Sequence, residues 1–257
     1  MEEQEELKNE LEGTRMSIIG HLGELRQRLF IIVATLFIGT IAAFSFAPQL
    51  FEILAQPLAA LTRQQLMVIG PLEMFLTYIK LSLLAALFAG FPIILLQIWH
   101  FIAPGLYAHE KRWLLPFIFL GSVFFIAGGL FAYKIVIPLG FKYLVNMVPE
   151  YIDVQYSVQI YFSLIIRLIL AFGVVFELPL FMWLLGASGI VSPESLSNFR
   201  KYWLIIAVFI GAMLTPPDPI TQMLMAVPLF LFFEIGLLGA RFLYKTRSRK
   251  TSVEEGL

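Results

Sequence analysis

Residues 157–186 read SVQIYFSLIIRLILAFGVVFELPLFMWLLG, and this stretch decides the class of fold. Its charged side chains are Arg167 and Glu177, and almost all the others are apolar. A helix needs about 20 predominantly apolar residues to cross the hydrocarbon core of a bilayer. The stretch exceeds that length, so it predicts a membrane-spanning helix.

The same apolar pattern recurs on both sides of this stretch. We predict membrane spans at residues 29–47, 74–99, 113–138, 157–186, 202–214 and 220–240. The last two form a hairpin turned by the proline cluster TPPDP, because proline lacks a backbone N–H and stops helices. The prediction is an all-α integral membrane protein of six transmembrane helices, the fifth and sixth of them short.

Composition agrees with a membrane protein and excludes several classes of function. Hydrophobic residues make up 59% of the chain and charged residues 14%, and the mean hydropathy is +0.84. A water-soluble domain of this size cannot bury so much apolar surface. The net charge is zero, which argues against a nucleic-acid partner. Cysteine is absent and the histidines lie far apart, so we expect no metal, no cofactor and no enzymatic activity.

Lysine and arginine are distributed asymmetrically between the predicted loops. One side carries Lys8, Arg15, Arg26, Arg28, Lys111, Arg112, Arg200, Lys201, Arg241, Lys245, Arg247, Arg249 and Lys250. The other side carries Arg63 and Lys142, with Lys134 near the end of the third span. Since basic loops stay in the cytoplasm, we predict a multi-pass membrane protein with both termini cytoplasmic.

Three regions follow from this topology. Residues 1–28 are a cytoplasmic tail and amphipathic entry, residues 29–240 a single six-helix membrane domain, and residues 241–257 a basic and then acidic cytoplasmic tail. The glutamate-rich start has no apolar core like that of a secretory signal. We expect it to be solvated and disordered.

Two segments on the outer side have more structure than simple connectors need. Residues 48–71 place leucines at helical spacing, with a break expected at Pro57, and residues 139–156 are rich in aromatic rings. We interpret both as periplasmic interfacial segments that cap the outer face. The alternative is that they are ordinary loops.

The fifth span is too short for an ordinary bilayer. About 14 residues reach only about 21 Å, against a hydrocarbon core of about 30 Å. Local thinning of the bilayer, or association with other helices, compensates such a mismatch. Thinning would lower the barrier to moving a polar polypeptide across.

Charged side chains inside the predicted spans are candidate functional residues. A carboxylate at the position of Glu177 costs roughly 2.5 kcal/mol or more on insertion scales. Arg167 lies ten residues away on the same helix, roughly 15 Å along the axis, so a direct pair is not expected. Glu177 therefore needs a partner on another helix, a water-filled hollow or a proton. Lys80 and Arg167 lie toward the outer halves of their spans and can extend toward the headgroups.

Two further glutamates lie near the cytoplasmic boundary. Glu24 precedes Arg28 by four residues, which permits a weak pair along one helix. Glu110 precedes the third span, where the helix dipole favours a negative charge. Taken alone, these local roles explain both residues.

Six blocks of sequence together resemble the TatC family of the twin-arginine protein translocase. They are HLGELRQRL (21–29), QIWHFIAPGLYAHEKR (97–112), FGVVFELP (172–179), SPE (192–194), LTPPD (214–218) and FEIG (233–236). They occur in order across nearly the whole chain. The resemblance implies a core receptor and scaffold that binds paired-arginine signal peptides of folded precursor proteins.

The resemblance also implies roles for particular residues. Glu24 and Glu110 match the signal-recognising glutamates, and Phe101 matches a position linked to signal binding. Arg26 and Arg28 match basic positions that orient the glutamates. Arginine's planar fork bonds a carboxylate through two parallel hydrogen bonds, which lysine does not do.

Other positions correspond to structural and partner sites of the family. Pro57 matches a residue that keeps the outer cap rigid. Thr215 and Gln222 match polar contacts to single-span subunits resembling TatA and TatB, although Gln222 has the alternative of a bond within the chain. The resemblance further implies residence in the bacterial cytoplasmic (inner) membrane, self-association and export driven by the proton motive force.

Two rival functions are a secondary transporter of a small solute and an intramembrane protease. No convincing internal repeat supports a transporter. The aspartates, Asp153 and Asp218, lie in predicted outer loops, which argues against a membrane aspartyl protease.

Overall fold

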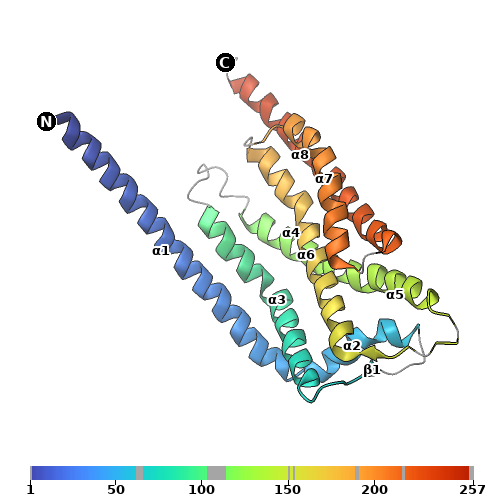
Figure 1. The fold of residues 1–257 in the computed structure, drawn as a ribbon. Coiled ribbons are helices and arrows are strands. Elements are labelled where there is room, and N and C mark those ends of the chain that lie inside the picture. Colours follow the sequence, from blue (N-terminus) through green and yellow to red (C-terminus); the bar gives the residue numbers. More distant parts are fainter. Residues whose placement is uncertain are drawn as a thin grey trace.

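The computed structural model describes residues 2–61, 66–102, 114–149, 151–152, 154–188, 191–215 and 218–254. Its elements in chain order are α1 (Glu2–Phe44), α2 (Ala47–Ala59), β1 (Leu66–Met67), α3 (Glu73–Ile102), α4 (Leu114–Phe131), the π-helix η3 (Ala132–Val136), α5 (Ile137–Asn146), β2 (Tyr156–Ser157), α6 (Val158–Ser188), α7 (Pro193–Leu214) and α8 (Pro219–Glu254). Both chain ends lie at one end of the helices, opposite α2 and β1 (Figure 1).

The described residues confirm the all-α membrane fold. Five helical stretches are long and apolar enough to cross a bilayer: Leu22–Phe44, Glu73–Phe101, Leu115–Asn146, Val158–Gly186 and Pro219–Phe242. Each corresponds to one of the predicted spans. α7 is not among the five, because its first turns carry Glu194, Arg200 and Lys201.

The prediction of a disordered acidic N-terminus was wrong. α1 begins at Glu2 and continues through the first span to Phe44 as a single helix of 43 residues. Glutamate, leucine and lysine are strong helix formers, so the segment extends a helix that the membrane span already stabilises. At 1.5 Å per residue α1 is roughly 65 Å long, about twice the hydrocarbon thickness.

The third span also differs from the prediction. The helix does not end at Pro138 but continues as α5 to Asn146, within the segment expected to be interfacial. Five residues of π-helix, Ala132–Val136, precede the proline. A π turn shifts the backbone hydrogen bonds by one residue, which lets the helix accommodate a proline that has no N–H to donate.

α2 continues through Pro57 to Ala59, so the expected break is also wrong. Because Pro57 has no N–H, the carbonyl of Ile53 loses its helical donor. The hydroxyl of Tyr133 donates to that carbonyl at 2.6 Å, and the hydroxyl of Tyr161 donates to the next one, Leu54, at 2.9 Å. Two tyrosines from the neighbouring helices thus hold the cap helix at its proline.

The buried carboxylate of Glu73 joins the segments next to α2 at this end of the protein. One of its oxygens accepts from the backbone N–H groups of Ile69 and Gly70, at 2.6 and 3.2 Å. The other accepts from the Ser157 hydroxyl at 2.8 Å and from the Gln159 N–H at 2.5 Å. Next to it, β1 pairs in parallel with β2. The starts of α3 and α6 are therefore fastened together.

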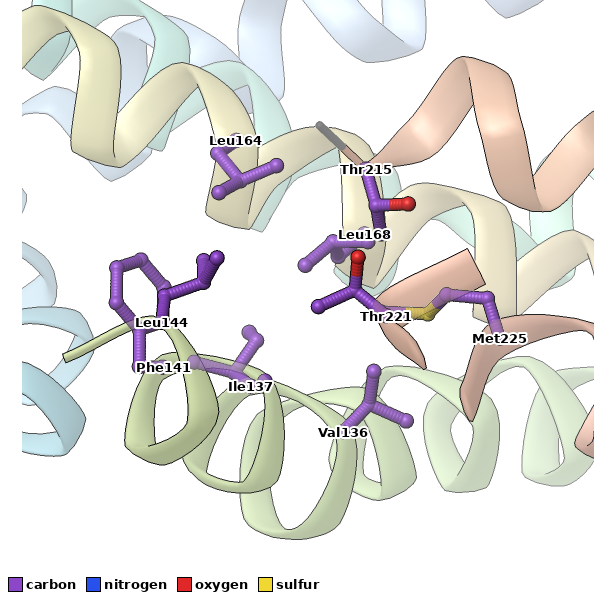
Figure 2. Close-up of a pocket in the computed structure, with 10 residues that line it drawn as sticks. Val136, Ile137, Phe141, Leu144, Leu164, Leu168, Thr215, Thr221 and Met225 are labelled. Atoms are coloured by element: carbon purple, nitrogen blue, oxygen red, sulfur yellow. The ribbon is translucent and has the colours of Figure 1, made fainter. Parts of the chain in front are cut away.

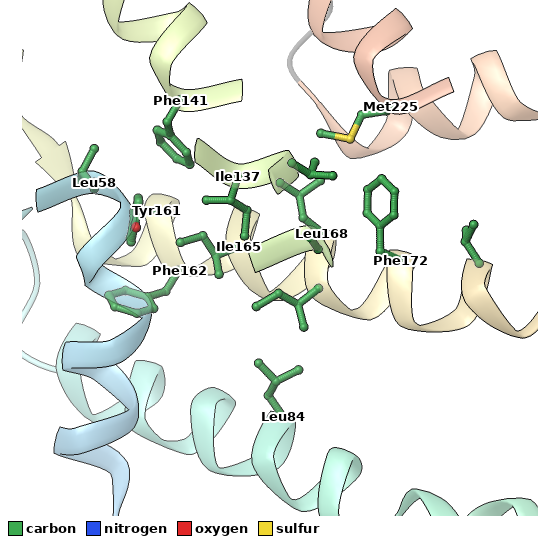
Figure 3. Close-up of a cluster of buried hydrophobic side chains, with 14 of the residues drawn as sticks. Leu58, Leu84, Ile137, Phe141, Tyr161, Phe162, Ile165, Leu168, Phe172 and Met225 are labelled. Carbon is green, nitrogen blue, oxygen red and sulfur yellow. The ribbon is translucent and has the colours of Figure 1, made fainter. Parts of the chain in front are cut away.

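α6 forms the centre of the apolar core. Figure 3 shows Ile165, Leu168 and Phe172 of α6 packed with Ile137 of α5 and Met225 of α8. α1 stands apart from this core and packs on α3. There, a Cβ on Gly39 would lie only 2.9 Å from the Ala86 Cβ, so the close approach of the two helices requires glycine.

α7 and α8 form the predicted hairpin. Ser192 caps α7 by accepting from the Ser195 N–H at 3.2 Å, and Asp218 caps α8 by accepting from the Thr221 N–H at 2.8 Å. α7 is longer than the predicted fifth span, because the Ser192 cap and the polar first turns extend the helix beyond its apolar part. The apolar part after Lys201 remains short.

Candidate functional site

Most of the described side chains of α1 between Gly20 and Phe30 are exposed. Glu24 and Arg26 are exposed. Leu22, Leu25 and Leu29, which are spaced along one face of the helix, are exposed as well. This end of α1 therefore presents charged and apolar groups together, which suits a ligand that has both.

A hydrogen bond joins α1 to the end of α3. Arg28 Nη1 donates to Gln97 Oε1 at 3.3 Å, across 69 residues of chain. Gln97 is almost completely buried, so its amide is held in place by the surrounding helices. The sequence analysis assigned no role to Gln97. Its place in the second matched block was the only signal for it.

The end of α3 is anchored by aromatic packing. Trp99 is buried, and its ring lies 4.8 Å from that of Phe117 on α4. Phe101 follows near the end of α3 and is half-buried. Glu110 lies outside the described residues. The structure thus places Glu24, Arg28 and Phe101 on neighbouring helices and leaves the position of Glu110 open.

Glu177 occupies an apolar site between α4 and α6. Its Oε1 is buried and has no hydrogen-bond partner in the described part of the chain. A Cβ on Gly121 would lie 3.1 Å from Glu177 Oε2, so the α4 backbone passes close to the carboxylate. Arg167 bonds to the Ser163 carbonyl instead, which confirms that it does not pair with Glu177.

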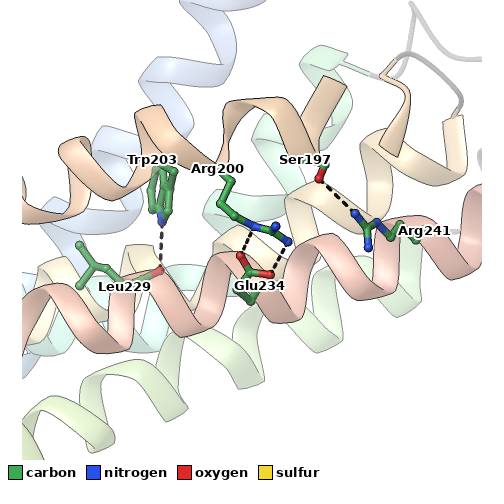
Figure 4. Close-up of polar contacts among 6 residues, drawn as sticks. All are labelled: Ser197, Arg200, Trp203, Leu229, Glu234 and Arg241. Carbon is green, nitrogen blue, oxygen red and sulfur yellow. Dashed lines mark hydrogen bonds and ion pairs between the residues drawn. The ribbon is translucent and has the colours of Figure 1, made fainter. Parts of the chain in front are cut away.

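An ion pair between α7 and α8 was missed by the sequence analysis. Arg200 Nε lies 2.5 Å from Glu234 Oε1, and its Nη2 lies 2.9 Å from Oε2, a two-point contact (Figure 4). On either side of it, Trp203 donates to the Leu229 carbonyl and Arg241 to the Ser197 hydroxyl. The sequence does place Glu234 inside the apolar part of α8, which indicates that it needs a partner. That partner, Arg200, is 34 residues away.

The two predicted partner-contact residues, Thr215 and Gln222, lie near the turn between α7 and α8. The Thr215 hydroxyl donates to the Gly211 carbonyl at 2.9 Å, and Gln222 Nε2 donates to the Val208 carbonyl at 3.0 Å. Gln222 thus makes the bond within the chain that was its alternative. Both side chains keep acceptor oxygens for a further contact.

An apolar pocket lies beside this turn, between α5, α6 and α8 (Figure 2). Aliphatic and aromatic groups form most of its wall, with Thr215 and Thr221 on one side. Both hydroxyls already donate to their own helices. Among the described residues, no group of three acidic, histidine or cysteine side chains has the arrangement of a metal site.

Comparisons with known proteins agree on one family. The family model described as "Sec-independent protein translocase protein (TatC)" matches residues 20–228. A protein of Magnetococcus marinus named "Sec-independent protein translocase protein TatC" is 42% identical over 93% of this chain and 89% of its own. The protein of that name from Aquifex aeolicus is 41% identical over 91% of this chain and 97% of its own.

A solved structure gives the same result. The crystal structure described as that of the twin arginine translocase receptor TatC superposes with a TM-score of 0.78 at 40% identity. It covers 87% of this chain and 99% of the solved one. The family match contains the quoted blocks between residues 21 and 218, and the solved structure shares the helical fold. The chain therefore belongs to the TatC family and is a receptor subunit of the Sec-independent, twin-arginine protein translocase, a transport component and not an enzyme.

Proposed function

We propose that this chain binds the paired-arginine signal peptides of folded precursor proteins through the carboxylates of Glu24 and Glu110. The observation that carries the proposal is the 3.3 Å hydrogen bond from Arg28 to Gln97. It links the two sequence blocks that contain the glutamates. Glu24 precedes Arg28 by one turn on α1, and Phe101 follows Gln97 by one turn on α3, so both belong to the same end of this helix pair.

The chemistry of the signal explains the choice of residues. Two guanidinium groups in sequence need two carboxylates, each of which accepts a pair of parallel hydrogen bonds. An exposed pair contributes little by itself. The ring of Phe101 and the lipid headgroups would exclude water and strengthen both pairs, while Arg26 and Arg28 orient the glutamates. The apolar part of the signal then follows the helices toward Glu177.

Site-specific crosslinking of a model signal peptide tests this recognition. We expect Glu24→Gln and Glu110→Gln each to reduce crosslinking by about tenfold, since a charge-assisted pair contributes about 1.4 kcal/mol or more. Replacing the paired arginines of the signal by lysines should have a similar effect on the unmodified protein. Glu194→Gln is the matched control, because Glu194 is an exposed carboxylate on α7. Equal loss in all three variants would refute the proposed site.

The carboxylate of Glu177, inside its membrane span, is proposed to couple export to the proton motive force. The buried Oε1 of Glu177, which lacks a partner in the described part of the chain, supports this, because a charged form is costly there. Transport driven by an imposed proton gradient should fall in Glu177→Gln. Unchanged transport rates in that variant would remove the idea.

Single-span subunits resembling TatA and TatB are proposed to contact Thr215 and Gln222. The Thr215 hydroxyl proton and one Gln222 N–H are used within the hairpin, so the partner would bond to the remaining oxygens or to the second N–H of Gln222. Such a contact in lipid contributes about 0.6 to 2 kcal/mol. Photo-crosslinkers at 215 and 222 should capture a single-span subunit, whereas one at lipid-facing Leu238 should not. Self-association is proposed in addition, and crosslinking between copies would measure it.

We further propose six spans in the bacterial inner membrane, with both termini cytoplasmic. Support comes from the two chain ends lying at one end of the helices (Figure 1) and from the excess of lysine and arginine in the segments predicted to be cytoplasmic, which include Arg26, Arg200 and Arg241. The chain has no cysteine, so single introduced cysteines report topology without a background. Gly20→Cys should react with an impermeant reagent only from the cytoplasm, and Tyr151→Cys only from outside.

A further inference from the structure

Two cationic side chains from different helices converge on one serine in the outer half of the protein. Lys80 Nζ of α3 donates to the Ser163 hydroxyl at 3.3 Å. Arg167 Nε of α6 donates to the Ser163 carbonyl at 3.1 Å. Because both bonds end on one residue, the ammonium and the guanidinium lie within roughly 10 Å of each other by covalent geometry.

Both groups lie at a depth where lipid chains surround the protein. Lys80 follows the start of α3 at Glu73 by seven residues, and Arg167 follows the start of α6 at Val158 by nine. At 1.5 Å per residue, these positions are about 10 and 14 Å from the outer ends of their helices. Both side chains are exposed on the surface. A cation at such a depth costs up to about 3 kcal/mol unless something solvates it.

No carboxylate of the described chain compensates these charges. The two bonds to Ser163 end on neutral oxygens, and neither cation forms an ion pair within the ranges that the structure describes. The nearest acid on α3, Glu73, already accepts four hydrogen bonds in the outer cap. Lysine has two further N–H donors and arginine four, so most of their hydrogen-bonding capacity is unused.

We propose that Lys80, Arg167 and Ser163 bind the phosphate group of an anionic phospholipid from the outer leaflet. A phosphodiester offers several acceptor oxygens, which can meet the ammonium and the arginine fork at the same time. Lipid is the molecule that surrounds an exposed side chain at this depth, and its acyl chains keep the phosphate within the membrane. The site is at the opposite end of α3 from Phe101, and it does not depend on how the signal peptide is recognised.

The proposed site has a mechanical consequence for the bilayer. A headgroup held about 10 Å below the outer end of α3 is drawn below its normal level. The outer leaflet next to α3 and α6 would therefore be thinner than elsewhere. Such thinning shortens the apolar barrier beside a protein that moves folded cargo.

Native mass spectrometry of the purified full-length protein tests the proposal. The protein would be released in the mass spectrometer from detergent micelles that contain phosphatidylglycerol and phosphatidylcholine. The number of molecules of each lipid that stay bound to the protein would then be counted. We expect preferential retention of phosphatidylglycerol, weakened by about fivefold for each charge removed in Lys80→Gln and Arg167→Gln. Lys142→Gln is the matched control, because Lys142 is an exposed basic residue of the same outer side.

Further variants and measurements separate lipid binding from its alternatives. The charge-conserving double variant Lys80→Arg/Arg167→Lys should keep the preference for phosphatidylglycerol, which separates loss of charge from loss of fold. Unchanged retention in Lys80→Gln/Arg167→Gln, or equal retention of both lipids by the unmodified protein, would overturn the proposal. Stabilisation of the lipid-free protein by inorganic phosphate as strong as that by phosphatidylglycerol would overturn the lipid assignment. Loss of self-association in the double glutamine variant, with lipid retention unchanged, would assign the cations to a protein carboxylate instead.

Discussion

Arg200 on α7 and Glu234 on α8 form a two-point ion pair, with N–O distances of 2.5 and 2.9 Å. The pair joins α7, whose apolar part is short, to α8, the helix that follows it. Their side chains are 43% and 27% exposed, so the contact is partly shielded from solvent. It complements the Trp203 and Arg241 contacts on either side in keeping the hairpin together.

The first prediction concerns this pair. Glu234→Gln and Arg200→Gln should each destabilise the protein by about 1.5–3 kcal/mol, because each leaves a partner charge unpaired. Thermal unfolding in detergent measures this, and a double-mutant cycle isolates the pair. Lys201→Gln is the control, since the Lys201 ammonium lies 5.2 Å from the ring of Tyr202 and forms no ion pair in the described chain. Additive effects of the two substitutions would contradict the interpretation.

The second prediction concerns the cap helix α2. Tyr133→Phe should destabilise the protein by about 1 kcal/mol, because it leaves the Ile53 carbonyl without a donor. In a Pro57→Ala background the same change should cost clearly less, since the alanine would supply the missing backbone N–H. Thermal unfolding of the four proteins in detergent gives the coupling. Tyr151→Phe, at a site 88% exposed, should have no effect in either background.

The third prediction concerns Glu73. Glu73→Gln replaces one acceptor oxygen by an amide group that donates, so at least two of the four hydrogen bonds are lost. We expect a loss of about 2–3 kcal/mol of stability and faster proteolysis of the loop before α3. Limited proteolysis and thermal unfolding of the protein in detergent measure the two effects. Glu52→Gln, on an exposed position of α2, should behave like the unmodified protein.

The fourth prediction concerns the surroundings of Glu177. Gly121→Ala would place a methyl group 2.6 Å from Leu95 Cδ1 and 3.1 Å from Glu177 Oε2, so these side chains must move. We expect a destabilisation of about 1–3 kcal/mol, together with reduced transport. Gly140→Ala is the matched control, since nothing lies within 4 Å of its added Cβ, and helix propensity alone should make it neutral or stabilising. Similar behaviour of the two variants would show that α4 does not confine Glu177.

The boundaries of the most apolar spans were predicted closely. α3 runs from Glu73 to Ile102 where 74–99 was predicted, and α6 from Val158 to Ser188 where 157–186 was predicted. The predictions failed where a helix extends beyond its apolar part, as in the first 28 residues and at the start of α7. Hydropathy marks where a chain meets lipid, whereas helix ends depend on caps and on neighbouring helices.

The candidate site also contains features that the sequence indicated and contacts that it did not. The sequence marked Glu177 as costly in lipid, and its buried, unpartnered oxygen in the described chain agrees with that. It marked Glu24 and Arg28 as members of one block, but it did not indicate that Arg28 reaches Gln97. It also placed Arg167 near the outer half of its span without revealing that Lys80 bonds to the same serine.

By itself the sequence determined that this protein lies in lipid, how many apolar segments it has and which charged residues lie within them, because each of these is a property of a segment taken alone. Only the tertiary structure decided which of those charges meet. The Arg200–Glu234 pair and the Lys80–Ser163 contact join residues 34 and 83 positions apart. Such contacts depend on the rotation and close approach of packed helices, which glycines such as Gly39 and Gly121 permit and which no single helix encodes.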